Sequence, residues 1–111
     1  MSIVGVTDQS IRKAADTIKN GGLVAMPTET VYGLGCNALD TNAVQKVFDA
    51  KGRTAINPLI VHVAAIAQAQ SISVFTPLAQ KIASYFWPGP VTLIVPKRDG
   101  AGVSDLCTAG L

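Results

Sequence analysis

The spacing between hydrophobic residues changes several times along this chain. Short apolar runs next to Gly or Pro predict strands, whereas apolar residues three and four positions apart predict helices. We expect strands over four short runs, 3–6, 23–26, 59–63 and 91–95, with a further extended piece at 71–75. We expect helices over 8–19, 41–50 and 77–86, with a shorter one at 64–70. Strands alternating with helices favour an α/β fold with a layered, partly parallel sheet.

Capping signals mark where the helices begin. Three positions carry side chains that can accept a hydrogen bond from the first helical turn: Thr7 or Asp8, Asp40 or Thr41, and Thr76 before Pro77. Gly21 and Gly22 end the first helix, and the Pro- and Gly-rich residues 87–90 predict a sharp turn after the last one. The apolar stripes expected to face the core are Ile11, Ala14, Ala15 and Ile18; Ala43, Val44, Val47 and Phe48; and Leu78, Ala79, Ile82, Ala83 and Phe86.

Length and composition narrow the class of protein. The 111 residues allow one small domain, 1–111, and an apolar content of 49% with 14% charged residues excludes a disordered chain. A net charge of +2 is too small to indicate nucleic-acid binding by itself. No apolar run is long enough to span a bilayer, and the N-terminus lacks a signal-peptide pattern. We therefore expect a cytoplasmic protein with reduced cysteines and no membrane partner.

The two cysteines and the single histidine give no metal-ligand spacing. Cys36 and Cys107 are far apart in the sequence, and His62 has no second cluster of ligands beside it, which argues against zinc. Cys36 is either a nucleophile or a small buried thiol, and the buried thiol is favoured because no activating neighbour is evident.

Residues 27–35, Pro-Thr-Glu-Thr-Val-Tyr-Gly-Leu-Gly, form the most distinctive stretch of the chain. Two hydroxyls, a carboxylate and a phenol follow an expected strand within a few residues, beside glycines that allow close approach to the backbone. The stretch is either a ligand site or a plain hairpin corner, and its local chemistry leaves both alternatives open.

A second polar group follows the second long helix. Lys51 and Arg53 flank Gly52, so both cations can reach one anion, such as a triphosphate with its magnesium ion. A solvated helix end is the alternative, because cations are favourable there in any case. Asn57 precedes Pro58 and is biased to an extended backbone, so its amide either meets a ligand or lies in an ordinary turn. Alternation over 59–63 places His62 on the same face as Ile60, where a core position is the commoner role for a lone histidine.

Three stretches of the chain carry a family resemblance: 27–35, 51–63 and 86–95. In them the chain resembles the YrdC-type family of threonylcarbamoyl-AMP synthases, and they occur in the order and approximate spacing that they have in that family. The resemblance implies a YrdC-like twisted open sheet of mixed parallel and antiparallel strands with flanking helices. It also implies a reaction of L-threonine, bicarbonate and ATP that yields threonylcarbamoyl-AMP and pyrophosphate. The product would serve a tRNA-modifying threonylcarbamoyltransferase complex.

The resemblance also implies roles for individual residues. Thr30, Tyr32 and His62 would hold L-threonine, whereas Arg53 and Asn57 would contact ATP, with Lys51 adding positive charge near the phosphates. Mg²⁺ would accompany ATP as its counterion. No residue would act as a covalent catalyst or as a protein ligand of a metal, and Thr28 and Glu29 receive no role.

The chain departs from the family at its end. Residues 108–111 resemble a stretch that in the family leads into a strand with a ligand-binding arginine, followed by a motif with Ser and Asn and a further arginine. About half of the expected pocket is therefore missing. A fragment, incomplete coverage of a longer protein, or completion by another subunit would each explain this departure, and we favour a fragment, the N-terminal portion of the fold.

Two other functions compete with this enzyme. One is a module that binds double-stranded RNA or tRNA without catalysis, through a modest set of basic residues: Arg12, Lys13, Lys19, Lys51, Arg53, Lys81, Lys97 and Arg98. RNA affinity that is sensitive to salt and needs no ATP would favour it. The other is the carbamoyl-transfer domain of hydrogenase maturation proteins, which ranks lower because no zinc-finger or acylphosphatase-like segment precedes Met1.

Overall fold

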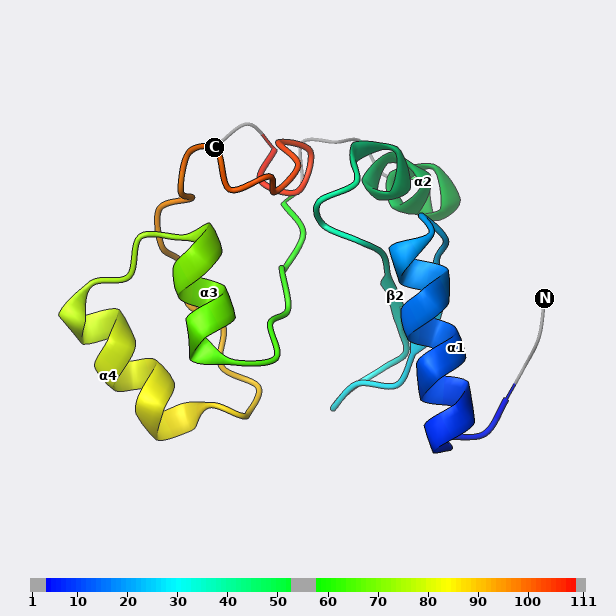
Figure 1. Ribbon diagram of the computed structural model, residues 1–111, viewed down its shortest axis with the longest axis horizontal. Coiled ribbons are helices and arrows are strands. Elements are labelled where there is room, and N and C mark those ends of the chain that lie inside the picture. The colour runs from blue at the N-terminus through cyan, green and yellow to red at the C-terminus, as the bar shows by residue number, and fades with distance from the viewer. Residues whose placement is uncertain (1–3, 53–57, 110–111) are drawn as a thin grey trace.

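The computed structural model describes residues 4–52 and 58–109. Within this part of the chain, helices and one small sheet follow each other in the order α1 Asp8–Lys19, β1 Val24–Met26, β2 Gly33–Gly35, α2 Thr41–Lys51, α3 Ile66–Ile72 and α4 Pro77–Phe86. Figure 1 shows α1, the two strands and α2 on one side of the molecule, and α3, α4 and the C-terminal coil on the other. None of the described helices is long and apolar enough to cross a bilayer.

The predicted helix starts are confirmed. Thr7 Oγ1 accepts the amide of Ser10 at 3.1 Å, and Ser10 Oγ accepts the amide of Thr7 at 2.8 Å, so the two residues form a capping box. Asp40 caps α2 and Thr76 caps α4, each by accepting an amide of the first turn at 3.1 Å. These local hydrogen bonds satisfy amides that have no partner inside the helix, which is why the sequence located the starts correctly.

The core is built on the apolar stripe of α2, as predicted. Its members are at most 2% exposed: Ala43, Val44, Val47 and Phe48. Val44 and Phe48 form a cluster with Cys107, and half-buried residues pack around it: Cys36, Ala38, Leu59, Val61, Val103 and Leu106. The cluster thus joins α2 to segments that lie before it and far beyond it in the sequence.

Hydrogen bonds at the edge of this cluster hold the same segments together. The amide of Leu59 donates to the carbonyl of Cys107 at 2.7 Å, and the amide of Ser104 donates to the carbonyl of Ala38 at 2.8 Å. The hydroxyl of Thr41 donates to that of Ser104 at 3.0 Å. Apolar burial and backbone pairing therefore fix the relation of 36–38, α2, 59–61 and 103–107 to one another.

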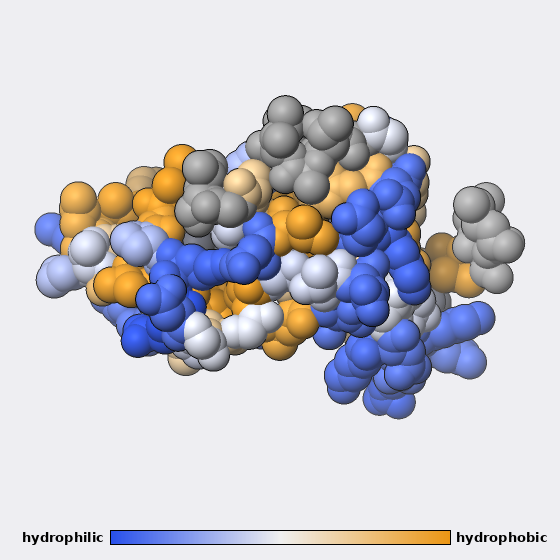
Figure 2. Space-filling model, turned by 90° about the horizontal axis from the view of Figure 1, so that it is seen from above, coloured by the Kyte–Doolittle hydropathy of each residue, from blue (hydrophilic) through white to orange (hydrophobic). Residues whose placement is uncertain are grey.

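A smaller packing region lies between α3 and α4. Ala69, Ala79 and Ala83 are buried there, whereas Leu78 and Phe86 are 67% and 57% exposed, so their prediction as core residues was wrong. A shallow apolar groove of about 210 Å³ runs between α4 and residues 93–96. Figure 2, seen from above, shows apolar side chains interspersed with hydrophilic ones over this half and mainly hydrophilic ones over the half that contains α1.

The sheet is smaller than the sequence predicted. β1 and β2 pair antiparallel with Met26 opposite Gly33 and Val24 opposite Gly35, and the described residues form no parallel ladder. Residues 4–6, 59–63 and 91–95 are irregular, so the strands expected there were wrong for the described residues. The apolar alternation is present in these segments, but a strand also needs a neighbouring strand with which its backbone can pair, and the described residues provide none.

Other predicted elements need smaller corrections. β1 lies within the strand predicted at 23–26, and it is partly exposed, with 37% of Met26 accessible to solvent. No residue of α1 is buried, and Ile11 on its apolar face is 56% exposed, so the core role of that face was wrong. α3 continues through Ile72, and in the expected extended piece at 71–75 only an isolated bridge between Ser73 and Lys97 is found. The predicted turn at 87–90 is confirmed, and the indole of Trp87 donates to the carbonyl of Val91 at 2.7 Å.

Both cysteines are free thiols that belong to the core. Burial raises the pKa of Cys36, and the nearby charge of Asp40 raises it further. The pKa of Cys107 is also raised, mainly by burial. A thiol with a raised pKa stays protonated at neutral pH and is a poor nucleophile, which supports the structural role of Cys36.

Truncation of Phe48 tests the core. Phe48→Ala should lower the free energy of unfolding by about 3–5 kcal/mol, because it removes a fully buried ring and leaves a cavity. Phe86→Ala is the matched control at an exposed site and should cost about 1 kcal/mol or less. Urea unfolding at pH 7 measures both, and equal losses in the two variants would contradict the assignment of the core.

The raised pKa values of the cysteines predict a fall in the free energy of unfolding at alkaline pH. Their pKa values are raised above the ordinary thiol value of 9.0 in the folded chain, so their contribution is complete below that value and is lost as the pH rises through the folded values. Urea unfolding between pH 7 and pH 10.5, with a reductant present, should show a steeper decline for the wild type than for a variant with Cys36→Ala and Cys107→Ala. Parallel pH profiles would contradict this assignment, because titrating Tyr and Lys residues are common to both proteins.

Candidate functional site

Residues 27–32 form the connection of the β1–β2 hairpin. The last pair of the ladder is Met26 with Gly33, and every residue between them is exposed. The distinctive polar stretch is thus a hairpin corner, one of the two alternatives that its composition left open. An exposed loop held at both ends by a ladder is also a common place for binding residues, so the two roles are compatible.

Thr28 organises this loop from within. Its hydroxyl donates to the carbonyl of Val31 and accepts the amide of Thr30 at 3.3 Å. Its methyl group lies over Gly33, where a Cβ atom would come within 3.3 Å of Thr28 Cγ2. No role was expected for Thr28 from the sequence, although Thr side chains that bond to the amide two residues later are known to stabilise turns.

The loop presents Thr30 and Tyr32 to solvent. Tyr32 is 77% exposed, and Thr30 is exposed as well. Within the part of the chain that the structure describes, neither hydroxyl takes part in a hydrogen bond. Their backbone is held by Thr28, whereas their side chains are unengaged.

His62 lies on the segment between α2 and α3. It is exposed together with Ile60, whereas Val61 and Val63 are half-buried, so the predicted alternation of faces is confirmed and a core position for the histidine is wrong. His62 Nδ1 lies 3.1 Å from the carbonyl oxygen of Ile60. A carbonyl only accepts, so this contact is a hydrogen bond in the tautomer that has the proton on Nδ1, and that tautomer leaves Nε2 as an acceptor.

Lys51 is the last residue of α2 and is exposed. Gly52 follows in the left-handed conformation with φ of 65°, which glycine adopts at little cost and which ends the helix. Arg53 and Asn57, the other two candidate residues for ATP, lie outside the described residues. A cation in the last turn also stabilises the helix dipole, so the position of Lys51 alone does not distinguish a phosphate site from an ordinary helix end.

The candidates for L-threonine come from two separate segments. Thr30 and Tyr32 belong to the hairpin on the side of α1, and His62 belongs to the chain that leads into α3. In the view of Figure 1, the hairpin loop and that chain both lie toward the middle of the molecule, between its two sides. In the described residues no hydrogen bond or ion pair joins Thr30, Tyr32, His62 or Lys51 to one another.

Several basic side chains have structural partners instead. Lys97 forms an ion pair with Asp105, and the hydrogen bond and charge of Lys97 lower the pKa of that carboxyl. Arg98 donates to the carbonyls of Gln70 at 3.1 Å and Ser73 at 3.2 Å, at the C-terminal end of α3. The proposed RNA-binding set included Lys97 and Arg98, so two of its cations also serve the fold.

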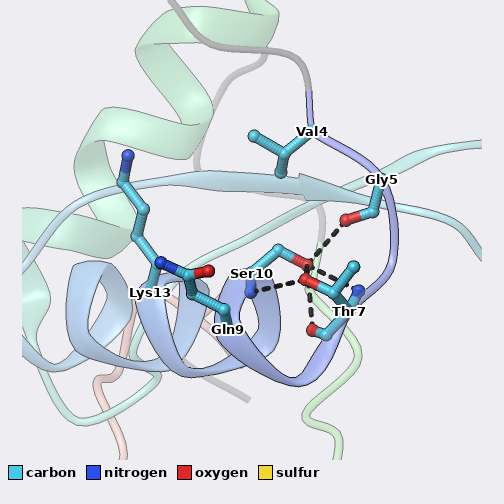
Figure 3. A pocket seen from close by; sticks show the side chains of 6 residues that line it. All are labelled: Val4, Gly5, Thr7, Gln9, Ser10 and Lys13. Carbon is cyan, nitrogen blue, oxygen red and sulfur yellow. Dashed lines mark hydrogen bonds between the residues drawn. The ribbon is translucent and has the colours of Figure 1, made fainter.

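Elsewhere in the described part of the chain, one surface depression lies apart from the candidate residues for L-threonine and ATP. A depression of about 290 Å³ lies at the N-terminus of α1, with Lys13 at its edge. Figure 3 shows that the hydroxyls there, those of Thr7 and Ser10, bond to each other and to the backbone as the helix cap. Across 4–52 and 58–109, no group of three or more His, Cys, Asp and Glu side chains could hold a metal ion.

Known proteins similar to this chain cover nearly all of it. It is 53% identical over 107 residues to a threonylcarbamoyl-AMP synthase of Pyrococcus abyssi, a match over 96% of this chain and 31% of the relative. It is 46% identical to the enzyme of that name from Bacillus subtilis, over 97% of this chain and 31% of that relative. The crystal structure of P. abyssi Sua5 complexed with L-threonine superposes with a TM-score of 0.88 at 50% identity, covering 97% of this chain and 32% of the other.

These matches confirm the predicted α/β class of the fold. The chain spans about a third of the length of these relatives. The family model of the Sua5, YciO and YrdC proteins, described as "Telomere recombination", matches residues 16–111. Since this match includes most of the chain, the chain belongs to the Sua5–YciO–YrdC family.

Proposed function

We propose that this chain supplies two parts of the active site of a threonylcarbamoyl-AMP synthase. The L-threonine side consists of Thr30, Tyr32 and His62, and the part of the phosphate side that the chain supplies consists of Lys51, Arg53 and Asn57. The observation that carries the proposal is the likeness, at 50% identity and over 97% of this chain, to a structure complexed with L-threonine. The relatives named above as threonylcarbamoyl-AMP synthases support the same reaction. The product would serve a tRNA-modifying threonylcarbamoyltransferase in the cytoplasm.

The reaction would proceed in two steps. The amine of L-threonine combines with bicarbonate and loses water to give an N-carboxylated amino acid. A carboxylate oxygen of this intermediate attacks the α-phosphorus of ATP, the bond to the β-phosphate breaks, and pyrophosphate leaves. Attack of this kind needs positioning and neutralisation of negative charge more than covalent help from the protein, so no nucleophilic side chain is required.

The candidate residues suit these demands. Thr30 and Tyr32 offer hydroxyls that make no hydrogen bond to the described residues, and His62 Nε2 offers an acceptor for an ammonium or hydroxyl group of L-threonine. Lys51 and Arg53 offer positive charge for phosphate oxygens, and Asn57 offers an amide. Mg²⁺ would accompany ATP and share the charge of the phosphates, with no protein ligand of its own.

Removal of Arg53 tests the phosphate side. Arg53→Ala should weaken binding of Mg-ATP by about 1.5–3 kcal/mol, because a charged hydrogen bond is lost. Arg12→Ala, on the exposed surface of α1, removes the same charge and should leave the affinity unchanged. Titration calorimetry measures both, and an unchanged affinity after Arg53→Ala would remove this residue from the site.

The same variants separate the enzyme from an RNA-binding module. Pyrophosphate release that depends on both L-threonine and bicarbonate would support the enzyme. RNA affinity that weakens equally in Arg12→Ala and Arg53→Ala, falls with added salt and needs no ATP would support the module instead.

Removal of His62 Nε2 tests the L-threonine side. His62→Asn keeps an N–H group able to donate to the carbonyl of Ile60 and removes only the outer acceptor. We expect L-threonine affinity to fall about fivefold to tenfold, as for one lost hydrogen bond, with little change in the free energy of unfolding. L-valine, which has a methyl group in place of the hydroxyl, serves as the control ligand, and full L-threonine affinity in His62→Asn would exclude this histidine from the site.

A further inference from the structure

The loop at 27–32 has no tertiary burial to order it. All its residues are exposed, although it carries two of the three candidate contacts to L-threonine. An exposed loop without local restraints samples many conformations, and a ligand then bears the entropic cost of ordering it. Any group that fixes the loop beforehand would therefore strengthen binding without touching the ligand.

The hydroxyl of Thr28 is such a group. By accepting the amide of Thr30 it fixes the peptide plane before Thr30, and by donating to the carbonyl of Val31 it fixes the plane that leads into Tyr32. One oxygen thus restrains the backbone at both residues that face the ligand. This is a local hydrogen bond of the kind by which Ser and Thr side chains stabilise turns.

The contact of Thr28 with Gly33 closes the loop at its other end. A Cβ atom at Gly33 would lie 3.3 Å from Thr28 Cγ2, closer than ordinary van der Waals contact, so the methyl group lies directly against the backbone of β2. Gly33 is also the ladder partner of Met26. The side chain of Thr28 therefore joins the start of the loop, its centre and its return to the sheet.

We propose that Thr28 is a positioning residue, which holds the hairpin loop in the conformation that presents Thr30 and Tyr32 to L-threonine. This inference rests on the proposed function, in which those two residues contact the substrate. Thr28 acts through the loop backbone, and its own hydroxyl is already engaged by Thr30 and Val31. Water can replace part of these bonds at an exposed site, so the effect on binding is moderate.

Two substitutions separate the hydroxyl from the methyl group. Thr28→Val keeps the shape and removes the hydroxyl, whereas Thr28→Ser keeps the hydroxyl and removes the methyl group. We expect Thr28→Val to weaken L-threonine binding about fivefold and Thr28→Ser to stay within about twofold of the wild type. Thr17→Val is the matched control, because it removes a hydroxyl bonded to the carbonyl of Lys13 on α1, away from the loop, and should not change binding.

Amide NMR of the free chain tests the loop without any ligand. In Thr28→Val, the amide of Thr30 should lose protection from hydrogen exchange and its signal should shift, with the wild-type behaviour largely restored in Thr28→Ser. Unchanged exchange in Thr28→Val, or equal loss in both variants, would overturn the positioning role. So would full L-threonine affinity in Thr28→Val when the wild type binds.

The outcomes distinguish this inference from the proposed function. If the wild-type chain shows no heat of binding with L-threonine, the proposed function fails for this chain, while the exchange data still decide whether Thr28 holds the loop. If the wild type binds and Thr28→Val binds equally well, the positioning role fails and the proposed function stands.

Discussion

Burial of one stripe of α2 is the interaction on which the described structure depends. Val44 and Phe48 are almost completely removed from solvent, and they pack with Cys107, a residue that lies about sixty positions later in the chain. A contact of this sequence separation has a large entropic cost of closure, which apolar burial of this extent can offset. The backbone bond from Leu59 to Cys107 then aligns the intervening segment on the same cluster.

This core also positions the candidate site. Lys51 ends the helix that supplies Phe48. His62 directly follows Val61, which packs against the cluster together with Leu59. The candidate phosphate side and one part of the L-threonine side are therefore attached to a single buried unit. A loss of packing there would displace both, even though neither residue belongs to the core.

The hairpin loop is ordered by a different kind of force. It has no buried side chain, and its geometry depends on a short ladder and on local hydrogen bonds from Thr28. Hydrogen bonds at an exposed site compete with water and contribute little to global stability. The loop can therefore be held in one conformation while contributing little to folding, and we expect substitutions in it to change binding more than stability.

The sequence by itself determined those features that depend on neighbours along the chain. Helix starts near Thr7, Asp40 and Thr76 and the buried stripe of α2 follow from local hydrogen bonds or from periodicity, and family motifs identified the fold. For residues 27–35 the sequence left a ligand site and a hairpin corner open, and only the pairing of β1 with β2 shows the hairpin. Tertiary structure alone decided the rest. Residues 59–63 and 91–95 are irregular, because a strand requires a neighbouring strand with which to pair. Arg98 donates to carbonyls at the C-terminal end of α3, because only folding brings distant backbone groups within reach of its side chain.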